Sequence, residues 1–532
     1  MSRLLLNALI LTCPLAAQIS VLTFQYDNSR AGANQNETIL TPANVNSASF
    51  GKLFSNSVDG YIYGQPLYLP AVAVPDKGTH NIVYVATERN SVYAFNADAQ
   101  GEPLWQVSFL VNGATSVPSG DVRCSQIAPE IGITSTPVID DRTGTIYLVA
   151  MTKESGNYVH RLHALDVATG AERFGSPVVI QASSPGTADG GDTVAFEPRN
   201  YKQRPGLLLL NGIVYLAWSS HCDIGRYHGW FMSYDARTLR QLKVFNNTPN
   251  GNQGSFWQGG AAPAADENGN IYLVAGNGTF DFATGGANLG ESYIKLRTRR
   301  PRRPGFSPFV ATRFVHDGLD LADYFTPFNY NSLNQRDLDV GSAGVALLGD
   351  EAGSEAHPHL MIGAGKEGRL YLLDRDNLGQ LSGAQADSQI VASSGANAIG
   401  GLFGNPAYFN HFVYFCGSGD NLKAYSVSNA VLSSQPASVT SARFGSPGCL
   451  PTISSAGSDN AIVWVLDAAN LLRAYDSQNL GVELYNSNMF SSRDALGRYV
   501  KFTTPMVVNG KVYAGTQSSL AVYGLLPSVT AP

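Results

Sequence analysis

The chain has 532 residues, more than one compact core usually holds, so several domains or a repeat architecture are expected. Hydrophobic residues make up 44% and charged residues only 14%, with 55 glycines and 25 tyrosines, which is typical of all-β proteins and excludes a coiled coil or a disordered chain. The formal net charge of −6 gives no electrostatic reason to expect a nucleic-acid or anionic-membrane partner.

The N-terminal stretch MSRLLLNALILTCPLAAQ has the pattern of an export signal: a positive start, a short apolar run and small residues at 16–17. The run is too short to span a bilayer, and no later segment approaches ~18 uninterrupted apolar residues. We therefore predict an export signal over 1–17. The mature chain, 18–532, is expected to have no membrane span and to be secreted or periplasmic. A lipoprotein site at Cys13 is an alternative, which the bulky residue before it disfavours.

A short phrase recurs along the chain. Residues 91–105 read SVYAFNADAQGEPLW, and residues 160–174 read HRLHALDVATGAERF. Both alternate apolar residues into Asn or Asp, continue through small residues and Gly, and end on an aromatic residue. Eight strands of this kind close at positions spaced between 48 and 77 residues apart, namely Asn96, Asp166, Asp235, Arg297, Asp374, Ser426, Asp476 and Gly524.

Each closing strand follows another strand, such as GTIYLVAMTK or GKVYAGTQSS, and most units open with a strand that begins at proline, such as TSTPVIDD. The strands alternate with period two and are bounded by Gly, Asn and Asp turns. Short antiparallel strands in eight repeated units predict an all-β fold, an eight-bladed β-propeller of four-stranded antiparallel blades. An open solenoid is the alternative.

The last unit stops soon after SSLAVYGLL and leaves room for only part of a blade. We expect the stretch ASFGKLFSNSVDG, residues 48–60, to supply the missing outer strand, because closing the ring leaves few exposed strand edges. Residues 18–532 then form a single propeller domain. The recurring phrase is mainly architectural: its aromatic and aliphatic side chains should pack between blades, and its Asp and Gly should form turns.

Four cysteines follow the predicted signal: Cys124, Cys222, Cys416 and Cys449. An even number in an exported protein permits two disulfides, but the sequence leaves the pairing open. No C-x-x-C-H motif occurs, so the chain carries no c-type haem of its own.

The pattern ALD-x-x-TG, closing a strand and followed by an aromatic residue, resembles the repeat of quinoprotein propellers. These include the alcohol and methanol dehydrogenases that depend on pyrroloquinoline quinone (PQQ), and also secreted propellers of unassigned activity. The resemblance covers nearly the whole mature chain. It implies the propeller fold, but scaffold propellers share the repeat, so it implies little about function on its own.

Three stretches resemble the enzymes more closely, around 223, from 255 to 281 and around 366, and they imply a role for four residues. A further segment, before the last of these, supplies a fifth. Asp223, in SSHCDIGRYHG, stands where the family places a calcium-binding carboxylate. Trp257, in SFWQGG, matches the floor beneath the quinone, and Asn277, in AGNGTFD, matches a calcium ligand. Lys366, in GAGKEGRLYLLDR, matches the cation that bonds the quinone oxygens. Asp339, in NQRDLDVGSAG, stands for the catalytic aspartate and a third calcium ligand.

The implied chemistry is coherent. A cation polarises the quinone carbonyls, and calcium takes hard oxygen ligands, which Asp223 and the Asn277 side chain offer. A flat cofactor stacks on an indole, as Trp257 provides. Lys366 stabilises negative charge on the quinone oxygen, while Asp339 takes the proton of a substrate hydroxyl.

The sequence also departs from the family pattern. The enzymes' pair of adjacent cysteines is reduced to Cys124 followed by Ser125, and an expected arginine is replaced near Glu130. Asp337 is the second choice for the catalytic carboxylate. Asp337 and Asp339 flank Leu338, and we expect at most one of the two carboxylates to face a central site.

Two functions follow. The first is a PQQ- and calcium-dependent dehydrogenase of alcohol or sugar hydroxyls that passes electrons to a separate acceptor. The second is a non-catalytic propeller that binds a polysaccharide, peptide or protein at its mouth. The enzyme hypothesis requires the Trp257, Asp223, Asn277 and Lys366 side chains to face one funnel. Five arginines within 297–303 predict an exposed insertion loop, with a polyanion-docking patch as the alternative.

Overall fold

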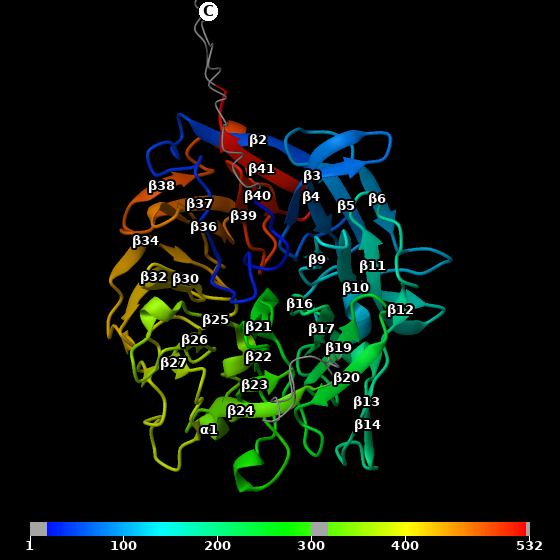
Figure 1. Ribbon diagram of the computed structural model, residues 1–532, viewed down its shortest axis with the longest axis vertical. Coiled ribbons are helices and arrows are strands. Elements are labelled where there is room, and N and C mark those ends of the chain that lie inside the picture. Colours follow the sequence, from blue (N-terminus) through cyan, green and yellow to red (C-terminus); the bar gives the residue numbers. More distant parts are fainter. Residues whose placement is uncertain (1–18, 299–317, 528–532) are drawn as a thin grey trace, which may run out of the picture.

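The computed structural model describes residues 19–298 and 318–527. It is 42% strand and 6% helix, and eight antiparallel sheets stand around a central axis as the blades of a propeller, as Figure 1 shows. The predicted fold class is confirmed. The predicted signal and four of the five clustered arginines lie outside the described residues. Within the described ranges no helix is both long and apolar enough to cross a bilayer.

Each blade has four strands, which follow in their order within the sheet. Blades 1 to 4 are β3 (Leu67–Val74), β4 (Gly78–Ala86), β5 (Ser91–Asn96), β6 (Trp105–Ser108); β9 (Val138–Asp140), β10 (Thr145–Glu154), β11 (Asn157–Asp166), β12 (Val178–Val179); β16 (Leu208–Leu210), β17 (Ile213–Ala217), β19 (Trp230–Asp235), β20 (Gln241–Asn246); and β21 (Ala264–Ala265), β22 (Asn270–Val274), β23 (Tyr293–Arg297), β24 (Asp320–Thr326).

Blades 5 to 8 are β25 (Val345–Leu347), β26 (Leu360–Ala364), β27 (Leu370–Asp374), β29 (Ala392–Ser393); β30 (Ala407–Phe409), β31 (Phe412–Cys416), β32 (Asp420–Ser428), β34 (Ser438–Phe444); β35 (Thr452–Ala456), β36 (Asp459–Asp467), β37 (Leu471–Asp476), β38 (Glu483–Asn486); and β39 (Met506–Val508), β40 (Lys511–Gly515), β41 (Ser519–Leu525), β2 (Phe50–Ser57). The first strand of a blade lies nearest the axis, as β9, β16, β21 and β39 do in Figure 1.

The remaining elements are short and decorate the blades. They are the strands β1 (Ala33–Asn34), β7 (Val117–Pro118), β8 (Glu130–Ile131), β13 (Ser183–Pro185), β14 (Thr193–Ala195), β15 (Tyr201–Lys202), β18 (Ser219–Ser220), β28 (Gln380–Leu381) and β33 (Val431–Leu432), the α-helices α1 (Tyr330–Gln335) and α2 (Ser491–Asp494), and the 3-10 helices η1 (Ser119–Val122), η2 (Pro198–Asn200), η3 (Gln258–Gly260), η4 (Phe282–Thr284), η5 (Val340–Ser342) and η6 (Asp350–Ala352).

The N-terminal part of the chain closes the ring. Strand β2 pairs antiparallel with β41, from Phe50 opposite Leu525 to Ser57 opposite Ser519, and so supplies the outer strand of blade 8. The predicted closing strand is therefore confirmed. Closure pairs the first and last strands of the ring, which removes an exposed edge.

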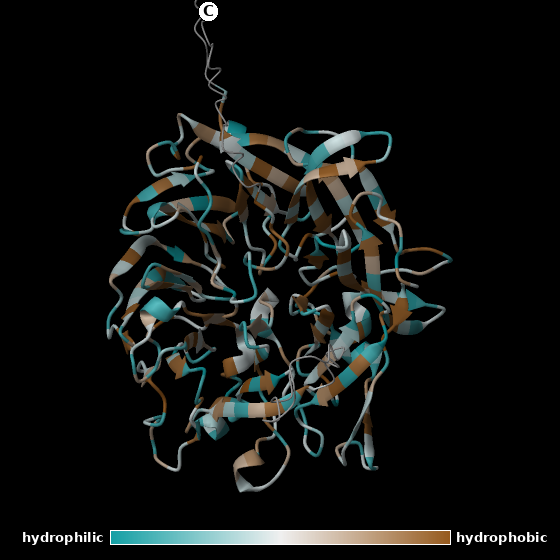
Figure 2. Cartoon of the chain, viewed as in Figure 1, coloured by the Kyte–Doolittle hydropathy of each residue, from teal (hydrophilic) through white to brown (hydrophobic). Residues whose placement is uncertain are grey.

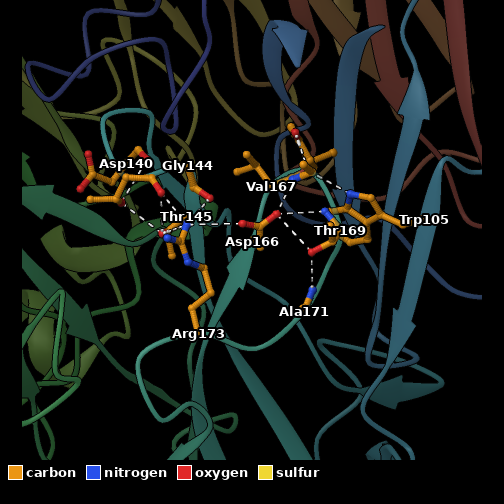
Figure 3. A network of polar contacts seen from close by, with 12 residues as sticks. Trp105, Asp140, Gly144, Thr145, Asp166, Val167, Thr169, Ala171 and Arg173 are labelled. Atoms are coloured by element: carbon orange, nitrogen blue, oxygen red, sulfur yellow. Dashed lines mark hydrogen bonds and ion pairs between the residues drawn. The ribbon is translucent and has the colours of Figure 1, made fainter. Parts of the chain in front are cut away.

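The recurring phrase forms the joint between neighbouring blades, as Figure 3 shows for blades 1 and 2. The Asp166 carboxylate accepts hydrogen bonds from the backbone N–H groups of Ala168 (2.9 Å) and Thr169 (3.1 Å) and so shapes the turn after β11. Trp105, which ends the first copy of the phrase, donates its indole N–H to the Val167 carbonyl at 2.9 Å. The aromatic end of one phrase thus holds the turn of the next.

A tyrosine hydroxyl repeats this joint around the ring. In each case it donates to the carbonyl of the residue that follows the closing position of the next blade. The bonds are Tyr84 to Val167, Tyr147 to Ala236, Tyr414 to Ser477 and, across the closure, Tyr513 to Ala97. A bond that recurs at one position of the repeat sets the same spacing between successive blades.

The hydrophobic core is divided among the blade interfaces. Figure 2 shows hydrophobic residues distributed through the strands of every part of the ring. Between blades 2 and 3, for example, Trp218, Trp230 and Leu216 are fully buried. Two disulfides are present, Cys124–Cys222 and Cys416–Cys449, which resolves the pairing that the sequence left open.

Candidate functional site

The antiparallel order of the strands brings two kinds of loop to one face of the propeller. The turn between the second and third strands of a blade and the connection to the next blade both lie there, because successive strands alternate in direction. A cavity of about 320 Å³ opens among these loops. It is lined by Gln126, Arg204, Asp223, Trp257, Gly259, Asp337, Asp339, Ser342, Lys366, Phe403, Ser446, Pro447, Lys501 and Phe502.

A lysine and two aspartates form the centre of one side. The Lys366 ammonium, in the turn between β26 and β27, lies 2.7 Å from an Asp339 carboxylate oxygen and 2.6 Å from one of Asp337. The Asn277 amide N–H donates to the same Asp337 oxygen at 2.8 Å. These side chains come from blades 4 and 5 and from the connection between them, so the structure brings together residues that are 89 positions apart.

The prediction that at most one of the two aspartates faces the site is wrong. Both line the cavity and both contact Lys366. Residues two apart would share a face even in an extended chain, so the expectation was mistaken in its geometry. Here the chain turns instead: Asp337 has a φ of 54°, in the left-handed region, η5 begins directly after Asp339, and both carboxylates reach the Lys366 ammonium.

Asp339 is buried beside other ionisable groups. Burial raises the pKa of Asp339 to about 6, while the Lys366 ammonium opposes the rise. Glu291 is also buried, and burial together with the nearby Asp339 charge raises its pKa well above the usual range. Glu291 accepts a hydrogen bond from the Val340 backbone N–H at 3.0 Å, which fixes the loop just after Asp339.

Trp257 lies beside Asp339 on the cavity wall, and Gly276 leaves room for these two side chains to lie close to the backbone. A Cβ added at Gly276 would lie 2.8 Å from an Asp339 carboxylate oxygen and 3.0 Å from the Trp257 ring. A Cβ at Gly259 would overlap the Phe403 carbonyl oxygen, and Gly259 has a φ of 49°. Both glycines let the backbone come near the cavity, which a side chain would prevent.

Asp223 lies at the rim. It is exposed, has a φ of 53°, and its carboxylate accepts a hydrogen bond from the Tyr227 hydroxyl. The neighbouring Cys222 forms a disulfide with Cys124, two residues from Gln126, which also lines the cavity. The disulfide thus joins two loops of the rim.

A cationic cluster that sequence reasoning missed also adjoins the cavity: Arg204 and Lys501 line it, and Lys202 lies against two of its lining residues, Gln126 and Trp257. Lys202 is fully buried, donates to the Gln126 side-chain oxygen at 3.2 Å and lies 4.8 Å from the Trp257 ring centroid. The Arg204 guanidinium lies 3.9 Å from the Phe502 ring centroid. Among the described residues no carboxylate lies within ion-pair distance of Lys202, Arg204 or Lys501. We call Lys202, Arg204 and Lys501 the cationic wall.

Burial and mutual repulsion affect the whole cationic wall. Burial lowers the pKa of Lys202 well below its usual range and lowers the pKa of Arg204 to about 10. Burial, with the Arg204 charge, lowers the pKa of Lys501 to about 8. The fully buried Glu88 lies nearby, and burial raises its own pKa to about 8. Buried cations without anionic partners are costly, so this wall has the electrostatic character of an anion-binding surface.

Two buried side-chain oxygens in this cluster are available to coordinate a hard cation, because they accept no hydrogen bond from the described residues. The Asn277 carbonyl oxygen and one Glu291 oxygen are buried and accept no hydrogen bond within the part of the chain that the structure covers. In the same described ranges no three His, Cys, Asp or Glu side chains gather as a metal site. A calcium ion here therefore needs Asn277 and oxygens of a ligand in addition to Asp339.

No protein-family model and no curated protein matches the sequence. Solved structures do match. A quinohemoprotein alcohol dehydrogenase from Pseudomonas putida HK5 has a TM-score of 0.60 at 14% identity, over 97% of this chain and 82% of that one. The quinohemoprotein alcohol dehydrogenase from Comamonas testosteroni has 0.60 at 15%, over 98% and 82%. A europium-containing methanol dehydrogenase has 0.59 at 11%, over 96% and 99%.

The chain therefore has the propeller fold of quinoprotein alcohol and methanol dehydrogenases, and the resemblance predicted from the repeat is confirmed for the fold. At 11% to 15% identity, fold is what the match establishes. Propellers of other kinds match as well.

Proposed function

We propose that the central cavity binds PQQ with a calcium ion, and that the protein is an exported dehydrogenase of alcohol or sugar hydroxyls which passes electrons to a separate acceptor. One observation carries the proposal: Trp257, Asp339, Lys366 and Asp223, singled out for their separate roles, line a single cavity. Asn277 is hydrogen-bonded to the same cluster. The two disulfides agree with export, since such bonds persist in oxidising compartments.

The two sides of the cavity suit the two parts of such a cofactor. PQQ supplies, when bound, an ortho-quinone that accepts electrons from a carbon–hydrogen bond, and it carries three carboxylates. The cationic wall would hold the carboxylates, since charge-assisted hydrogen bonds to guanidinium and ammonium groups are strong. Trp257 offers a flat apolar surface for the rings. Asn277 and Asp339 offer oxygens for calcium.

Asp339 would act as the base. With its pKa raised to about 6, the carboxyl is mostly ionised at neutral pH and yet basic enough to accept the proton of a substrate hydroxyl. Lys366 holds the carboxylate in place and places positive charge at the centre of the cavity. Phe403 and Phe502 add apolar surface to the lining of the cavity.

The test is reconstitution followed by tryptophan fluorescence. Adding PQQ with calcium to the purified mature chain should quench Trp257, the one tryptophan among the residues lining the cavity. Trp257→Phe should abolish the quenching, whereas Trp105→Phe, at the joint of blades 1 and 2, should retain it. Oxidation of alcohols with an artificial acceptor should then depend on both additions. Absence of calcium-dependent binding at micromolar PQQ would overturn the proposal.

One observation favours the second function, a non-catalytic propeller with an anionic partner. Lys366 already pairs with both aspartates, so the acidic side has a cation of its own, whereas no described carboxylate lies at ion-pair distance from the cationic wall. In that case a polyuronate or an acidic peptide should bind at the mouth in the presence of a chelator. Binding of PQQ would then be weak and indifferent to calcium.

A further inference from the structure

A second cavity, of about 510 Å³, lies between blades 1 and 2 and shares no residue with the central one. One wall comes from the outer strand β6 and the loop that follows it, and the other from the long strands β10 and β11. At its base is His163, on β11, whose exposed fraction is only 3%.

His163 is held in one orientation. One ring nitrogen, Nδ1, lies 2.7 Å from a Glu172 carboxylate oxygen, and the ring stacks on Phe109 with centroids 3.8 Å apart. Burial lowers the pKa of His163, against the opposing effect of Glu172, so the imidazole is neutral at neutral pH. A neutral ring that donates from Nδ1 to a carboxylate keeps a lone pair on Nε2.

The other nitrogen of His163 has no hydrogen-bond partner among the described residues, although the side chain lines the cavity. His160, three positions earlier on β11, provides a contrast. Its Nε2 lies 3.1 Å from the Pro198 carbonyl oxygen and 3.2 Å from that of Tyr201, and its Nδ1, which has no partner among the described residues, is buried. The free nitrogen of His163 belongs instead to a side chain that lines the cavity, which His160 does not.

The surroundings indicate which ligand fits. Arg161 and Glu154 form an ion pair on the rim, and Glu172 adds one further negative charge, which disfavours an anion. Val107, Val111 and Pro177 provide apolar surface, and Val111 is 58% exposed. Ligand sites of this kind combine apolar walls with a few convergent polar groups.

We propose that this cavity binds a neutral polyhydroxylated molecule, of the class of a monosaccharide or one unit of a longer saccharide. A ligand hydroxyl donates to Nε2 of His163, further hydroxyls bond to Glu154, Glu172 and Arg161, and the carbon face of the sugar ring lies on Val107 and Val111. The site is independent of the central cavity and of any catalysis there.

Carbethoxylation of histidine tests the proposal in the full mature chain, because diethyl pyrocarbonate reacts with neutral imidazole nitrogens that solvent reaches. Mass spectrometry should find His163 modified and His160 unmodified. Glucose, galactose, N-acetylglucosamine and cellobiose are the probes, each at concentrations well above millimolar. At least one should slow the reaction of His163 several-fold and leave His357, which is exposed, unchanged. Protection by none of the four, or an unreactive His163, overturns the proposal.

Two variants separate the site from the fold. Glu172→Gln removes the carboxylate that fixes the tautomer, and Val111→Glu places a charge on the apolar wall; both should abolish protection by the sugar without lowering the melting temperature by more than a few degrees. Val179→Glu is the matched control for Val111→Glu, because Val179, on β12 of blade 2, is also an exposed valine (49%) but does not line the cavity. If protection survives both cavity variants, the sugar binds elsewhere and the proposal is wrong.

Discussion

The two sides of the central cavity carry charge in opposite ways. On one side, the Lys366 ammonium pairs with both Asp337 and Asp339, at 2.6 and 2.7 Å. On the other, Lys202 and Arg204 are buried with no carboxylate at ion-pair distance among the described residues. Charges paired inside the protein stabilise its shape, whereas buried charges without a partner reduce stability until a ligand supplies one. The comparison predicts that the acidic side maintains the site and that the cationic wall recognises the ligand.

Removing one lysine from each side should give opposite results, and this is the largest effect we expect. Lys366→Met leaves Asp339 buried beside Asp337 and should lower the free energy of unfolding by about 3 kcal/mol at pH 8. The loss should be smaller at pH 5, because Asp339 then takes a proton. Lys202→Met removes an unpaired buried cation and should leave stability unchanged or raise it. Urea unfolding at both pH values measures this.

Lys366→Arg is the control for the acidic side, since it retains the charge between the two aspartates. Equal destabilisation by Lys366→Met and Lys202→Met would contradict the comparison, because it would mean that both lysines act only through packing.

Arg204→Gln should weaken PQQ binding about 10- to 100-fold, in line with ~1.5–3 kcal/mol for a hydrogen bond to a charged group. It should not destabilise the protein without ligand, because Arg204 forms no ion pair with any residue that the structure describes. Titration of tryptophan fluorescence gives the affinity, and Arg226→Gln, an exposed cation of the Asp223 hairpin, is the control. An unchanged affinity in Arg204→Gln would place the ligand carboxylates elsewhere.

The fold could be predicted from the sequence because its signal is repeated. Strands with period-two alternation recur in eight units, so even the closing strand at 50–57 followed from counting what the last unit lacked. Trp257, Asn277 and Lys366 could be found because each stands in a longer motif. The cationic wall could not: Lys202, Arg204 and Lys501 lie in connections without a motif, and only closure of the ring brings residues almost 300 positions apart to one wall.

The pair at 337 and 339 shows a different reason for failure. Alternate residues of a strand share a face, so the expectation that only one of the two aspartates faces the site fails even for an extended chain, and the left-handed φ at Asp337 shows that this segment is a turn. A backbone angle of that kind is set by the tertiary contacts of the loop. The Leu338 backbone N–H, for instance, donates to the Leu333 carbonyl at 3.0 Å.

Glu88 provides a finer test of the cationic wall through pH. Its pKa is raised by burial from 4.5 to about 8, so in the folded protein it binds a proton that the unfolded chain releases above pH 4.5. Its contribution to stability is present below pH 4.5 and is lost as pH rises to about 8. Glu88→Gln should therefore raise the free energy of unfolding at pH 8 by about 1.5 kcal/mol and leave it unchanged at pH 4.

A pH series of urea unfolding for wild type and Glu88→Gln checks this prediction. If the wild-type slope between pH 5 and 8 is already flat, Glu88 is neutralised by the cationic wall, and the wall then has an internal partner. That outcome would remove the difference between the two sides of the cavity on which the ligand argument depends.

We expect the smallest effect from comparing the removal of one disulfide with the removal of the other, because the two enclose loops of different length. Cys124–Cys222 encloses 98 residues and joins the loops of Gln126 and Asp223, whereas Cys416–Cys449 encloses 33. Because the entropy that a cross-link removes from the unfolded chain grows with the logarithm of loop length, Cys124→Ser with Cys222→Ser should cost about 1 kcal/mol more than Cys416→Ser with Cys449→Ser. Urea unfolding of the two double variants measures the difference.

The first pair of substitutions, at Cys124 and Cys222, should also lower ligand affinity, since it frees loops at both the acidic rim and the cationic wall. Loss of affinity in the second pair alone would show instead that the loop of Ser446 and Pro447 governs entry to the cavity.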